Sequence, residues 1–474
     1  MFFTNLRRSI KIKKMLEYSL DDTIIAISTP PGYGGIGIIR LSGEKALPIA
    51  IRIFRPKKKP GAGVLPGQAI IGNLIDFEKN EIFDEAYLIF FPAPRSYTRE
   101  NVVEISCHGS PAVMENVIRL GIKAGARHAH PGEFTLRAYW KGRIDIIQAE
   151  AVNDLIRAAS IKQARIAFGH LEGRLSRQIS EIRDKIVHLL SQIEAAIEFP
   201  DQNLRITPKK IALAFEKMIE FLEKLVASYD AGKALTEGLM IAITGRTNVG
   251  KSTLFNALLE EQRAIVTPYP GTTRDYLREK IRIKDAVINL VDMAGLGRAS
   301  SLIEKEGMKK GNKIASQAEG LLVLIDVSRK ETREDFALIE KYKQKKILLV
   351  FNKIDLPSKM DAAKIKNRYR DLPSLDISAL KGTNLIHLKN KIYEIFLPKL
   401  KDGEDVIFHL RQKLLIEEIL DHLKNGRELL ESGFPEEVYA EEIRKIVPVV
   451  GRLTGEIHAD DVIENIFSRF CLGK

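Results

Sequence analysis

The pattern of apolar positions predicts short strands in the first third of the chain. Apolar runs there are brief, are separated by Pro and Gly turns, and lie at 24–27, 36–41, 86–91 and 102–106. Such runs predict β-strands, and two segments between them have helical spacing. We therefore expect an α+β domain over residues 21–141.

The pattern changes at about residue 142, where apolar residues begin to recur every three or four positions with few helix breakers. This spacing predicts long helices over 145–197, 209–229, 405–432 and 438–450. Strand-like runs lie between the second and third of these helices. The simplest architecture is one helical domain formed by residues 142–237 and 400–474, with an α/β domain, residues 238–399, inserted into it. Two independent helical bundles are the alternative.

The strand expected at 239–244 leads directly into a glycine-rich loop. The loop reads Gly245-Arg-Thr-Asn-Val-Gly-Lys251-Ser252, which fits G-x-x-x-x-G-K-[ST]. In a loop of this kind backbone N–H groups turn toward the β-phosphate of a nucleotide, the lysine reaches the β and γ oxygens, and the hydroxyl holds Mg²⁺. Lys251 and Ser252 are the candidates for the last two roles.

A second apolar strand, 287–291, ends in Asp292-Met-Ala-Gly295, a D-x-x-G motif. Its aspartate can join the Mg²⁺ shell and its glycine N–H can meet a γ-phosphate. The next residue is Leu296, which cannot orient water as the glutamine of Ras-type enzymes does. Catalytic help must come from elsewhere, and the amide oxygen of Asn248 could bind a monovalent cation near the γ-phosphate. We hypothesise that this cation is potassium.

Two later motifs predict recognition of guanine. Asn352-Lys-Ile-Asp355 follows the strand expected at 346–351, and Ser378-Ala379-Leu380 follows one more short strand. A carboxylate can accept hydrogen bonds from both N1–H and the 2-amino group of guanine, whereas adenine offers neither donor there. The ordered set of four motifs therefore favours GTP.

This region resembles the G domain of the translation-factor-related GTPases, with Gly271-Thr272-Thr273-Arg274-Asp275 as switch I and Thr273 completing the Mg²⁺ shell with Ser252. The resemblance implies that GTP contacts Asn248, Val249, Gly250, Lys251, Ser252, Thr253, Thr267, Gly271, Thr272, Thr273, Asp292, Gly295, Asn352, Lys353, Asp355, Ser378 and Ala379.

The composition of the chain indicates what kind of partner it binds and in which kind of compartment it works. A length of 474 residues corresponds to about three domains. The net charge of +12 and pI near 9.3 favour an anionic partner such as nucleic acid. Cys107 and Cys471 are the only cysteines, which excludes a disulfide framework and suits a reducing compartment. No apolar run is long enough to span a membrane. Residues 1–20 form a basic extension that superficially suits an organelle transit peptide. We interpret it as a loose extension and expect a cytoplasmic protein, with the mitochondrial matrix as the alternative.

Motifs at the two ends of the chain carry a more specific resemblance. They are Thr29-Pro-Pro-Gly-Tyr-Gly-Gly-Ile-Gly-Ile-Ile-Arg40, His130-Pro-Gly-Glu-Phe-Thr-Leu-Arg-Ala138, Gln148-Ala-Glu-Ala151 and Phe470-Cys471-Leu-Gly-Lys474. From about residue 21 to its end, the chain resembles the MnmE (TrmE) family of tRNA-modification GTPases, with a TrmE-type G domain. The resemblance implies a folate-binding N-terminal domain, a helical middle domain and an inserted P-loop G domain.

The resemblance also implies a reaction. A potassium-activated GTPase would dimerise and act on tRNA together with an FAD-containing, MnmG-type partner. Together they would add a carboxymethylaminomethyl or aminomethyl-type group at C5 of the wobble uridine. The carbon would come from 5-formyl-tetrahydrofolate or another tetrahydrofolate.

The same resemblance assigns residues to these roles. The catalytic candidates are Glu304, which would orient water, with Lys251 and Cys471. Potassium would be held by Asn248, Thr267, Tyr269 and Thr272, and folate by Arg40, Glu104, Arg143 and Lys474. The chain departs from the family pattern at Arg143, where lysine is usual, and also at Thr247, Met293 and Gly297. Cys107 and His108 are adjacent on a strand, so their side chains diverge and a structural role is expected.

Two other functions share the GTP motifs. The first is an RNA-binding GTPase switch in ribosome assembly, and the second is folate-dependent aminomethyl transfer to a protein or small molecule. The N-terminal domain and the tail from Cys471 to Lys474 favour tRNA modification over the first. Binding of tRNA as against a free amine acceptor would separate the second.

Overall fold

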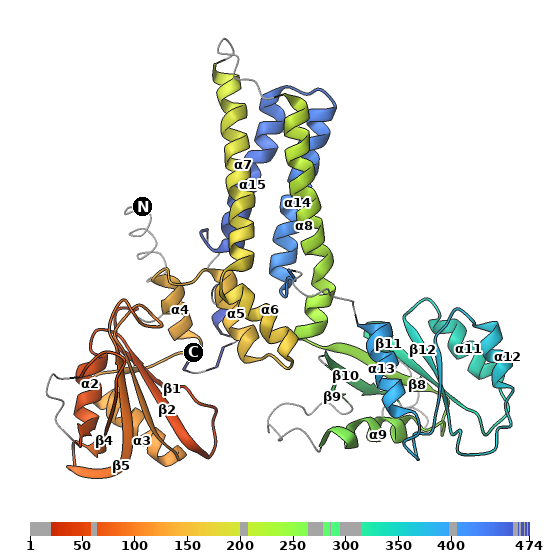
Figure 1. The fold of residues 1–474 in the computed structure, drawn as a ribbon, viewed down its shortest axis with the longest axis horizontal. Helices are drawn as coiled ribbons and strands as arrows, with labels where there is room; N and C mark the ends of the chain where they lie inside the picture. The colour runs from red at the N-terminus through yellow and green to blue at the C-terminus, as the bar shows by residue number, and fades with distance from the viewer. Residues whose placement is uncertain are drawn as a thin grey trace, which may run out of the picture. The chain divides into compact units, whose positions relative to one another are not determined.

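The computed structural model describes most of the chain as two compact units. It describes residues 20–57, 64–199, 207–263, 278–284, 286–293, 314–397, 405–457, 463, 466–468, 470, 471, 473 and 474. The first unit contains the described parts of Met1–Asn153, Phe168–Ala212 and Asn425–Lys474, and the second those of Asp154–Ala167 and Leu213–Lys424. Each unit is built around its own sheet (Figure 1).

The first unit contains a seven-stranded sheet in the order β3-β4-β5-β6-β2-β1-β7. Neighbouring strands are antiparallel except for the parallel pair β1 and β7. The strands are β1 (Ile24–Ile27), β2 (Gly34–Ser42), β3 (Phe54–Pro56), β4 (Ala69–Asp76), β5 (Glu81–Phe91), β6 (Val102–Gly109) and β7 (Arg127–His128). Each of the four strands expected from the apolar runs is found, and β3, β4 and β7 were not foreseen.

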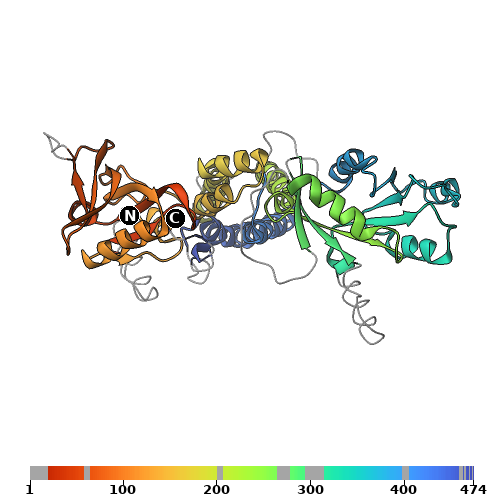
Figure 2. The same ribbon diagram turned by 90° about the horizontal axis from the view of Figure 1, so that it is seen from below.

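Helices α2 (Ala46–Ile53) and α3 (Pro111–Lys123) lie against the sheet (Figures 1 and 2). Their apolar residues pack with alternate strand residues such as Ile39, Leu88 and Ile105, all of which are fully buried. Two helices were expected in this region and are present, and a third that was not predicted, α4 (Glu133–Trp140), follows β7. The apolar pattern did not reveal α4 because its inward side chains include two charged residues, Glu133 and Arg137.

The segment expected as long helix over 145–197 is divided into α5 (Ile146–Ile156), α6 (Ile161–Leu171) and α7 (Arg174–Glu198). At the start of α6, the Gln163 N–H donates to the Ser160 hydroxyl while the Gln163 side chain accepts from the Ala159 N–H. This reciprocal capping starts a new helix. Gly173 then adopts the left-handed φ of 80° that ends α6 and precedes α7.

Two pairs of long helices follow, one within each unit. In the first unit, α7 packs against α15 (Glu436–Thr454), and Arg444 donates to Glu194 at 2.7 Å (Figure 1). In the second unit, Lys424 of α14 (Leu410–Glu431) pairs with Glu223 of α8 (Pro208–Thr236) at 2.6 Å. The predicted helices at 209–229 and 438–450 are therefore confirmed.

Residues 405–409 were expected to begin a helix, which is wrong because α14 starts at Leu410. Val406, Ile407 and Phe408 are instead buried and belong to no helix or strand. The Ile407 N–H donates to Ser228 of α8, and a Cβ on Gly232 would lie 2.1 Å from the Ile407 carbonyl oxygen. Burial of this segment against α8 therefore outweighs the helical periodicity of its sequence.

The second unit contains a six-stranded sheet in the order β13-β12-β11-β8-β10-β9, parallel except for the edge strand β9. The strands are β8 (Leu239–Gly245), β9 (Arg278–Ile283), β10 (Ala286–Asp292), β11 (Gly320–Asp326), β12 (Ile347–Asn352) and β13 (Ser374–Ile377). The strands expected at 239–244, 287–291 and 346–351 are all present. Their nearly continuous apolar sequences are typical of strands buried on both faces.

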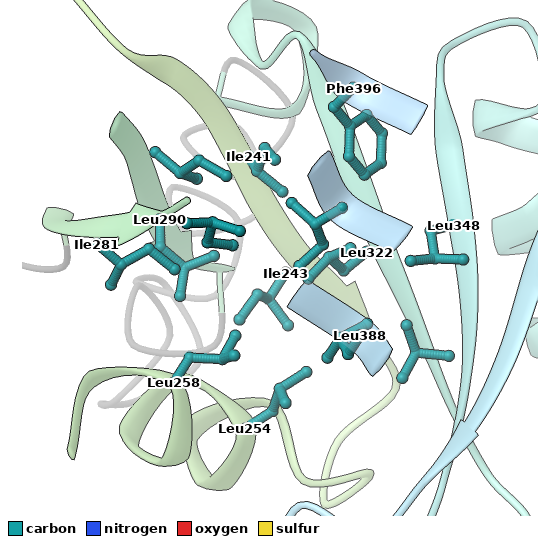
Figure 3. Packing of buried hydrophobic residues seen from close by; sticks show 14 of the residues in the cluster. Ile241, Ile243, Leu254, Leu258, Ile281, Leu290, Leu322, Leu348, Leu388 and Phe396 are labelled. Atoms are coloured by element: carbon teal, nitrogen blue, oxygen red, sulfur yellow. The ribbon is translucent and has the colours of Figure 1, made fainter. Parts of the chain in front are cut away.

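Figure 3 shows one of the two cores of this sheet. Strand residues Ile243 and Leu322 meet Leu254 of α9 (Lys251–Arg263) and Leu388 of α13 (Leu385–Phe396). The second core, on the other side, contains residues of α11 (Arg333–Tyr342) and α12 (Ala362–Arg368). This two-sided packing fixes the carboxyl ends of β8, β10, β11 and β12, where the nucleotide motifs lie.

Among the helices that the structure describes, none is both long enough and apolar enough to cross a membrane.

Candidate nucleotide site and cofactor cavity

The glycine-rich loop connects the end of β8 to the start of α9. Its last glycine, Gly250, has a φ of 100°, and a Cβ at this position would lie 2.4 Å from Asn352 Nδ2. Gly245 has a φ of 154°, and a Cβ there would lie 2.6 Å from the Leu324 carbonyl oxygen. Glycine is therefore required at both ends of the loop, because the loop packs directly on the strands that follow it.

Lys251 and Ser252 open α9 at the inner side of this loop. The Lys251 ammonium donates to the carbonyl oxygens of Gly245 at 2.9 Å and Arg246 at 2.7 Å, which curls the side chain back over the loop. Burial lowers the pKa of Lys251, and the nearby Asp292 opposes that shift. The Ser252 hydroxyl donates to Asp292 Oδ2 at 2.7 Å. A hydroxyl and a carboxylate side by side are hard oxygen donors of the kind that Mg²⁺ prefers.

Side chains of the motif from Asn352 to Asp355 form hydrogen bonds with the phosphate loop. Asn352 donates from Nδ2 to the Val249 carbonyl at 2.8 Å and accepts from the Ala379 N–H at 2.9 Å. Lys353 donates to the Asn248 carbonyl at 2.8 Å. Asn352 thus joins three segments that are distant in sequence, namely the phosphate loop, β12 and the loop after β13.

Asp355 stands at the outer edge of this arrangement. Its carboxylate accepts from the Ser378 hydroxyl at 2.6 Å, and that hydroxyl accepts from the Lys381 N–H at 3.1 Å. Asp355 is otherwise exposed. A carboxylate held in place on one side and open on the other is suited to bind the two donors of a guanine edge.

Asp326 is a residue of this site that the sequence analysis missed. It ends β11, accepts from Lys353 Nζ at 2.6 Å and from the Ser328 hydroxyl at 2.6 Å. Burial alone would raise the pKa of Asp326, but the hydrogen bonds from Lys353 and Ser328 outweigh it and lower the pKa. The available signal was an acidic residue at the carboxyl end of an apolar run.

Two of the predicted residues, Asn248 and Thr253, are exposed, and others lie outside the described residues. Asn248 lies in the phosphate loop at a φ of 60°, and its exposed side chain makes no hydrogen bond within the described residues. Thr253 follows Ser252 in α9 and is exposed. The remaining candidates lie outside the described residues: Thr267, Tyr269, Gly271, Thr272, Thr273, Gly295 and Glu304, together with Leu296 and Gly297.

The first unit contains a cavity of about 550 Å³. It is lined by Phe91, Pro94, Arg95, Ser96, Tyr97, Arg99, Val102, Glu104 and Arg143. Two of the four predicted folate residues, Glu104 and Arg143, are therefore in its wall. A third, Arg40, lies on the strand next to Glu104 and donates to its Oε1 from Nε at 2.9 Å and from Nη2 at 2.7 Å.

The aromatic ring of Tyr97 lies close to the guanidinium groups of Arg40 and Arg143. The Arg143 guanidinium lies 4.7 Å from the centre of the Tyr97 ring, and Arg143 also donates to the Tyr97 carbonyl at 3.3 Å. The Arg40 guanidinium lies 5.6 Å from the same ring. Burial raises the pKa of the Tyr97 hydroxyl, which is hydrogen-bonded to Thr135 of α4 at 2.9 Å. A ring attractive to both cations therefore orients them.

The C-terminal residues are docked on this unit. The carbonyl oxygen of Gly473 accepts from the Ser28 hydroxyl and from Arg40 Nη1 at 3.3 Å, and Lys474 accepts from the Phe134 N–H at 3.2 Å. Burial lowers the pKa of the Lys474 ammonium, and the charge of Arg40 lowers it further. Lys474 is therefore part of a packed tail beside Arg40.

Cys471 lies in the same tail and is an exposed free thiol. Cys107, by contrast, is buried in β6, and burial together with the charge of Asp84 raises its thiol pKa to about 11. His108 points away and pairs with Asp84 at 2.6 Å. The two side chains diverge as expected, and Cys107 packs in the core.

The first unit, which contains the cavity, also contains a buried ionic network that the sequence did not reveal. Arg137 of α4 is 1% exposed and Glu133 is fully buried. Arg137 donates to Glu133 at 2.9 Å, to Asp22 at 2.5 Å and to Glu100 at 3.2 Å, and Arg127 also pairs with Glu133 at 2.6 Å. The signal was the charged pair inside the motif from His130 to Ala138, for which no role had been assigned.

The motif from Gln148 to Ala151 has a comparable local role. Gln148 and Asp145 exchange hydrogen bonds between side chain and backbone at the start of α5. The Gln148 amide also donates to the Leu171 carbonyl at the end of α6. Burial raises the pKa of Asp145. These residues fix the turn of α5 against α6 and do not line the cavity.

Comparisons with known proteins found two matching family models and a set of similar curated proteins. Residues 23–143 match the model of the GTP-binding protein TrmE N-terminus, and residues 146–471 match that of the MnmE helical domain. A tRNA modification GTPase MnmE from Thermoanaerobacter sp. (strain X514) is 39% identical over 96% of this chain and 99% of that protein. The proteins of the same name from Moorella thermoacetica and Desulforamulus reducens are 37% and 38% identical, each over 96% of this chain and 100% of that protein.

Proposed function

Because the chain belongs to the MnmE family of tRNA modification GTPases, we propose that it hydrolyses GTP to drive modification of the wobble uridine of certain tRNAs. The group would be of the aminomethyl or carboxymethylaminomethyl type, attached at C5. What carries the proposal is that one chain of this family combines a guanine-nucleotide site with an arginine-lined cavity beside a docked C-terminal tail.

We propose that GTP binds where the phosphate loop meets Asn352. Lys251, freed from the loop carbonyls, would bind the β- and γ-phosphates, and Asp355 would bind the guanine edge. Ser252 with Asp292 would hold Mg²⁺, which neutralises phosphate charge when bound, and Thr273 would complete its shell. The pairing of Ser252 with Asp292 supports this assignment.

We propose that potassium binds beside the Asn248 side chain, with Thr267, Tyr269 and Thr272 as its other ligands. The amide of Asn248 is exposed and makes no hydrogen bond within the part of the chain that is described, so its oxygen is available to a cation. Replacing potassium by sodium at equal ionic strength should slow GTP turnover sharply. Equal rates in the two salts would remove the potassium assignment and leave the GTPase assignment standing.

Glu304 is the proposed residue that orients the attacking water. Substitution Glu304→Ala should cripple hydrolysis and leave GTP affinity unchanged, because the residue would act on water and not on the nucleotide. The matched control is Glu306→Ala, which removes the same charge two positions away. Equal hydrolysis by wild type and Glu304→Ala would refute this role.

The cavity of the first unit is the proposed folate site. Glu104 would accept from donors of the pterin ring, while Arg40, Arg143 and Lys474 would bind its anionic and carbonyl oxygens. Arginine at position 143 keeps the charge of the lysine that is usual in the family, and its stacking on Tyr97 supports its use as an anion ligand. Cys471, exposed in the docked tail, is a further catalytic candidate.

The proposed assembly is a homodimer that works with an FAD-containing, MnmG-type partner in the cytoplasm. The relatives named above are bacterial proteins, which favours the cytoplasm over a mitochondrial matrix. The proposed domains are residues 21–141, 142–237 with 400–474, and 238–399.

The decisive experiment is mass spectrometry of nucleosides from total tRNA, from cells lacking this chain and from the same cells with it restored. Loss and return of C5-aminomethyl-type uridines is the expected result. If these nucleosides persist while ribosomal subunits accumulate unassembled, the chain is an RNA-binding switch and the proposal is wrong. If tRNA is unchanged but a protein or free amine acceptor is aminomethylated, the substrate assignment is wrong.

A further inference from the structure

The wall of the cavity in the first unit carries more positive charge than the four proposed folate residues account for. Arg95 and Arg99 also line it, next to Arg143. Within the described part of the chain, none of these three guanidinium groups pairs with a carboxylate: Arg99 donates to the Lys141 carbonyl at 2.9 Å and Arg143 to the Tyr97 carbonyl. The excess charge therefore faces the cavity without a partner of opposite sign.

The acidic residue in the same wall does not offset this charge. Glu104 is already neutralised by Arg40, which binds it through two nitrogens. Glu100, which lies next to Arg99 in sequence, is turned the other way and accepts from Arg137 and Ser42. The cavity wall thus holds one acid that is already neutralised, Glu104, and three cations without a carboxylate partner in the described residues, Arg95, Arg99 and Arg143, which we call the cationic end.

The backbone holds the cationic end in place at some cost. Arg99 has a φ of 59°, in the left-handed region that non-glycine residues seldom occupy. Its guanidinium is nevertheless fixed on the Lys141 carbonyl, which leaves other N–H groups free toward the cavity. Arg143 is held by its stacking on Tyr97 at 4.7 Å. Two of the three cations are therefore oriented before any ligand arrives, which reduces the entropy that binding must overcome.

We propose that this cationic end binds the oligo-γ-glutamyl tail of the folate, so that the site selects polyglutamylated tetrahydrofolates over the monoglutamate. The inference rests on the proposed folate function of the cavity. With the pterin bound at Glu104, the tail of the same molecule would be within the cavity that these arginines also line. Each added glutamate brings one more carboxylate, and planar guanidinium groups bind carboxylates with two hydrogen bonds.

The test compares 5-formyl-tetrahydrofolate monoglutamate with its triglutamate, by isothermal titration calorimetry on the full-length chain. We expect the triglutamate to bind roughly two- to five-fold more tightly for each exposed arginine it engages, with the gain shrinking at high salt. The double substitution Arg95→Gln with Arg99→Gln should abolish the gain and leave the affinity for the monoglutamate nearly unchanged. The matched control is Arg55→Gln, an exposed arginine of β3 that does not line the cavity, which should keep the full gain.

The outcomes separate the two proposals. Equal affinity of the wild type for both ligands, or a gain that survives the double substitution, overturns the tail assignment while the folate site stands. Failure of the wild type to bind even the monoglutamate overturns the folate function, and the tail assignment with it. A double variant that loses affinity for tRNA but keeps the full triglutamate gain would assign the two arginines to an RNA phosphate and also overturn the inference.

Discussion

Substitution Arg137→Met should unfold the N-terminal sheet domain at a lower denaturant concentration without affecting the GTPase. The Arg137 side chain is 1% exposed and donates to Glu133, Asp22 and Glu100. Methionine fills a similar volume but leaves fully buried Glu133 with Arg127 as its remaining cation. Removing one partner from a buried ion pair costs about 3–5 kcal/mol, because the carboxylates that stay behind lose part of their charge compensation while buried.

The single tryptophan makes this loss measurable in the presence of the other unit. Trp140 is the last residue of α4, the helix that carries both Glu133 and Arg137, so its fluorescence reports unfolding of this region. With an m-value of about 1–3 kcal/mol per molar urea, the expected loss lowers the urea midpoint by about 1–5 M. The control Arg55→Met removes an exposed arginine and should change stability by less than about 0.5 kcal/mol.

The network also predicts a pH dependence. Burial would raise the pKa of Asp22, but hydrogen bonds from Arg127 and Arg137 outweigh it, so the pKa lies below its ordinary value of 3.8. A carboxylate with a lowered pKa stabilises the folded state above its ordinary pKa, and this contribution is lost as the pH falls through the lowered value. Below pH 3.8, the urea midpoint of unfolding should therefore fall more steeply with decreasing pH for the wild type than for Arg137→Met.

A change of less than about 1 kcal/mol in Arg137→Met would refute the reasoning, since it would mean that the ion network is energetically replaceable by apolar contact. A parallel drop in the GTP hydrolysis rate of the folded variant would also count against it, because the network belongs to the first unit alone.

Three further predictions follow from single contacts. Gly473→Ala would place a Cβ 2.2 Å from the Ile27 carbonyl oxygen, at a residue with a φ of 82°, so the substitution should detach the tail. Folate binding measured by calorimetry should weaken by tenfold or more, which is about 1.4 kcal/mol. Unchanged affinity would show that the docked tail is not part of the site. Asp355→Asn should weaken GTP binding at least about tenfold in a fluorescent-nucleotide titration, because a hydrogen bond to a charged group contributes about 1.5–3 kcal/mol. Full affinity of this variant would exclude Asp355 from binding the guanine edge. Iodoacetamide at about pH 8 should alkylate Cys471 well before Cys107, whose pKa of about 11 keeps it protonated in the core; mass spectrometry showing the reverse order would contradict the burial argument.

The sequence by itself determined the elements and motifs whose physics is local. Nearly continuous apolar runs predicted β8, β10 and β12, because strands buried on both faces need no polar residues, and each run ended at the motif that now stands at the sheet edge. The glycines of the phosphate loop could likewise be predicted, because a close backbone approach tolerates no other residue. The GTPase assignment needed nothing more.

Other local signals were present in the sequence but were outweighed by the helical pattern. Ser160 and Gln163 form the spacing of a capping box, and Gly173 is a typical helix terminator, so the division of residues 145–197 into three helices could have been predicted. The non-helical segment Val406 to Phe408 could not, because its conformation depends on burial against α8.

Only the tertiary structure decided which distant residues act together. No spacing rule links Asp22 and Glu100 to Arg137, or Arg40 to the carbonyl of Gly473, because these contacts are made by strand pairing and tail docking across most of the chain. The cationic end of the cavity is of the same kind: Arg95 and Arg99 carry no signal in the sequence, and only the fold brings them into one cavity wall with Arg143, which the family resemblance had assigned to folate. Charges are long-ranged and depend on position in space, so their partners follow from the fold and not from the pattern.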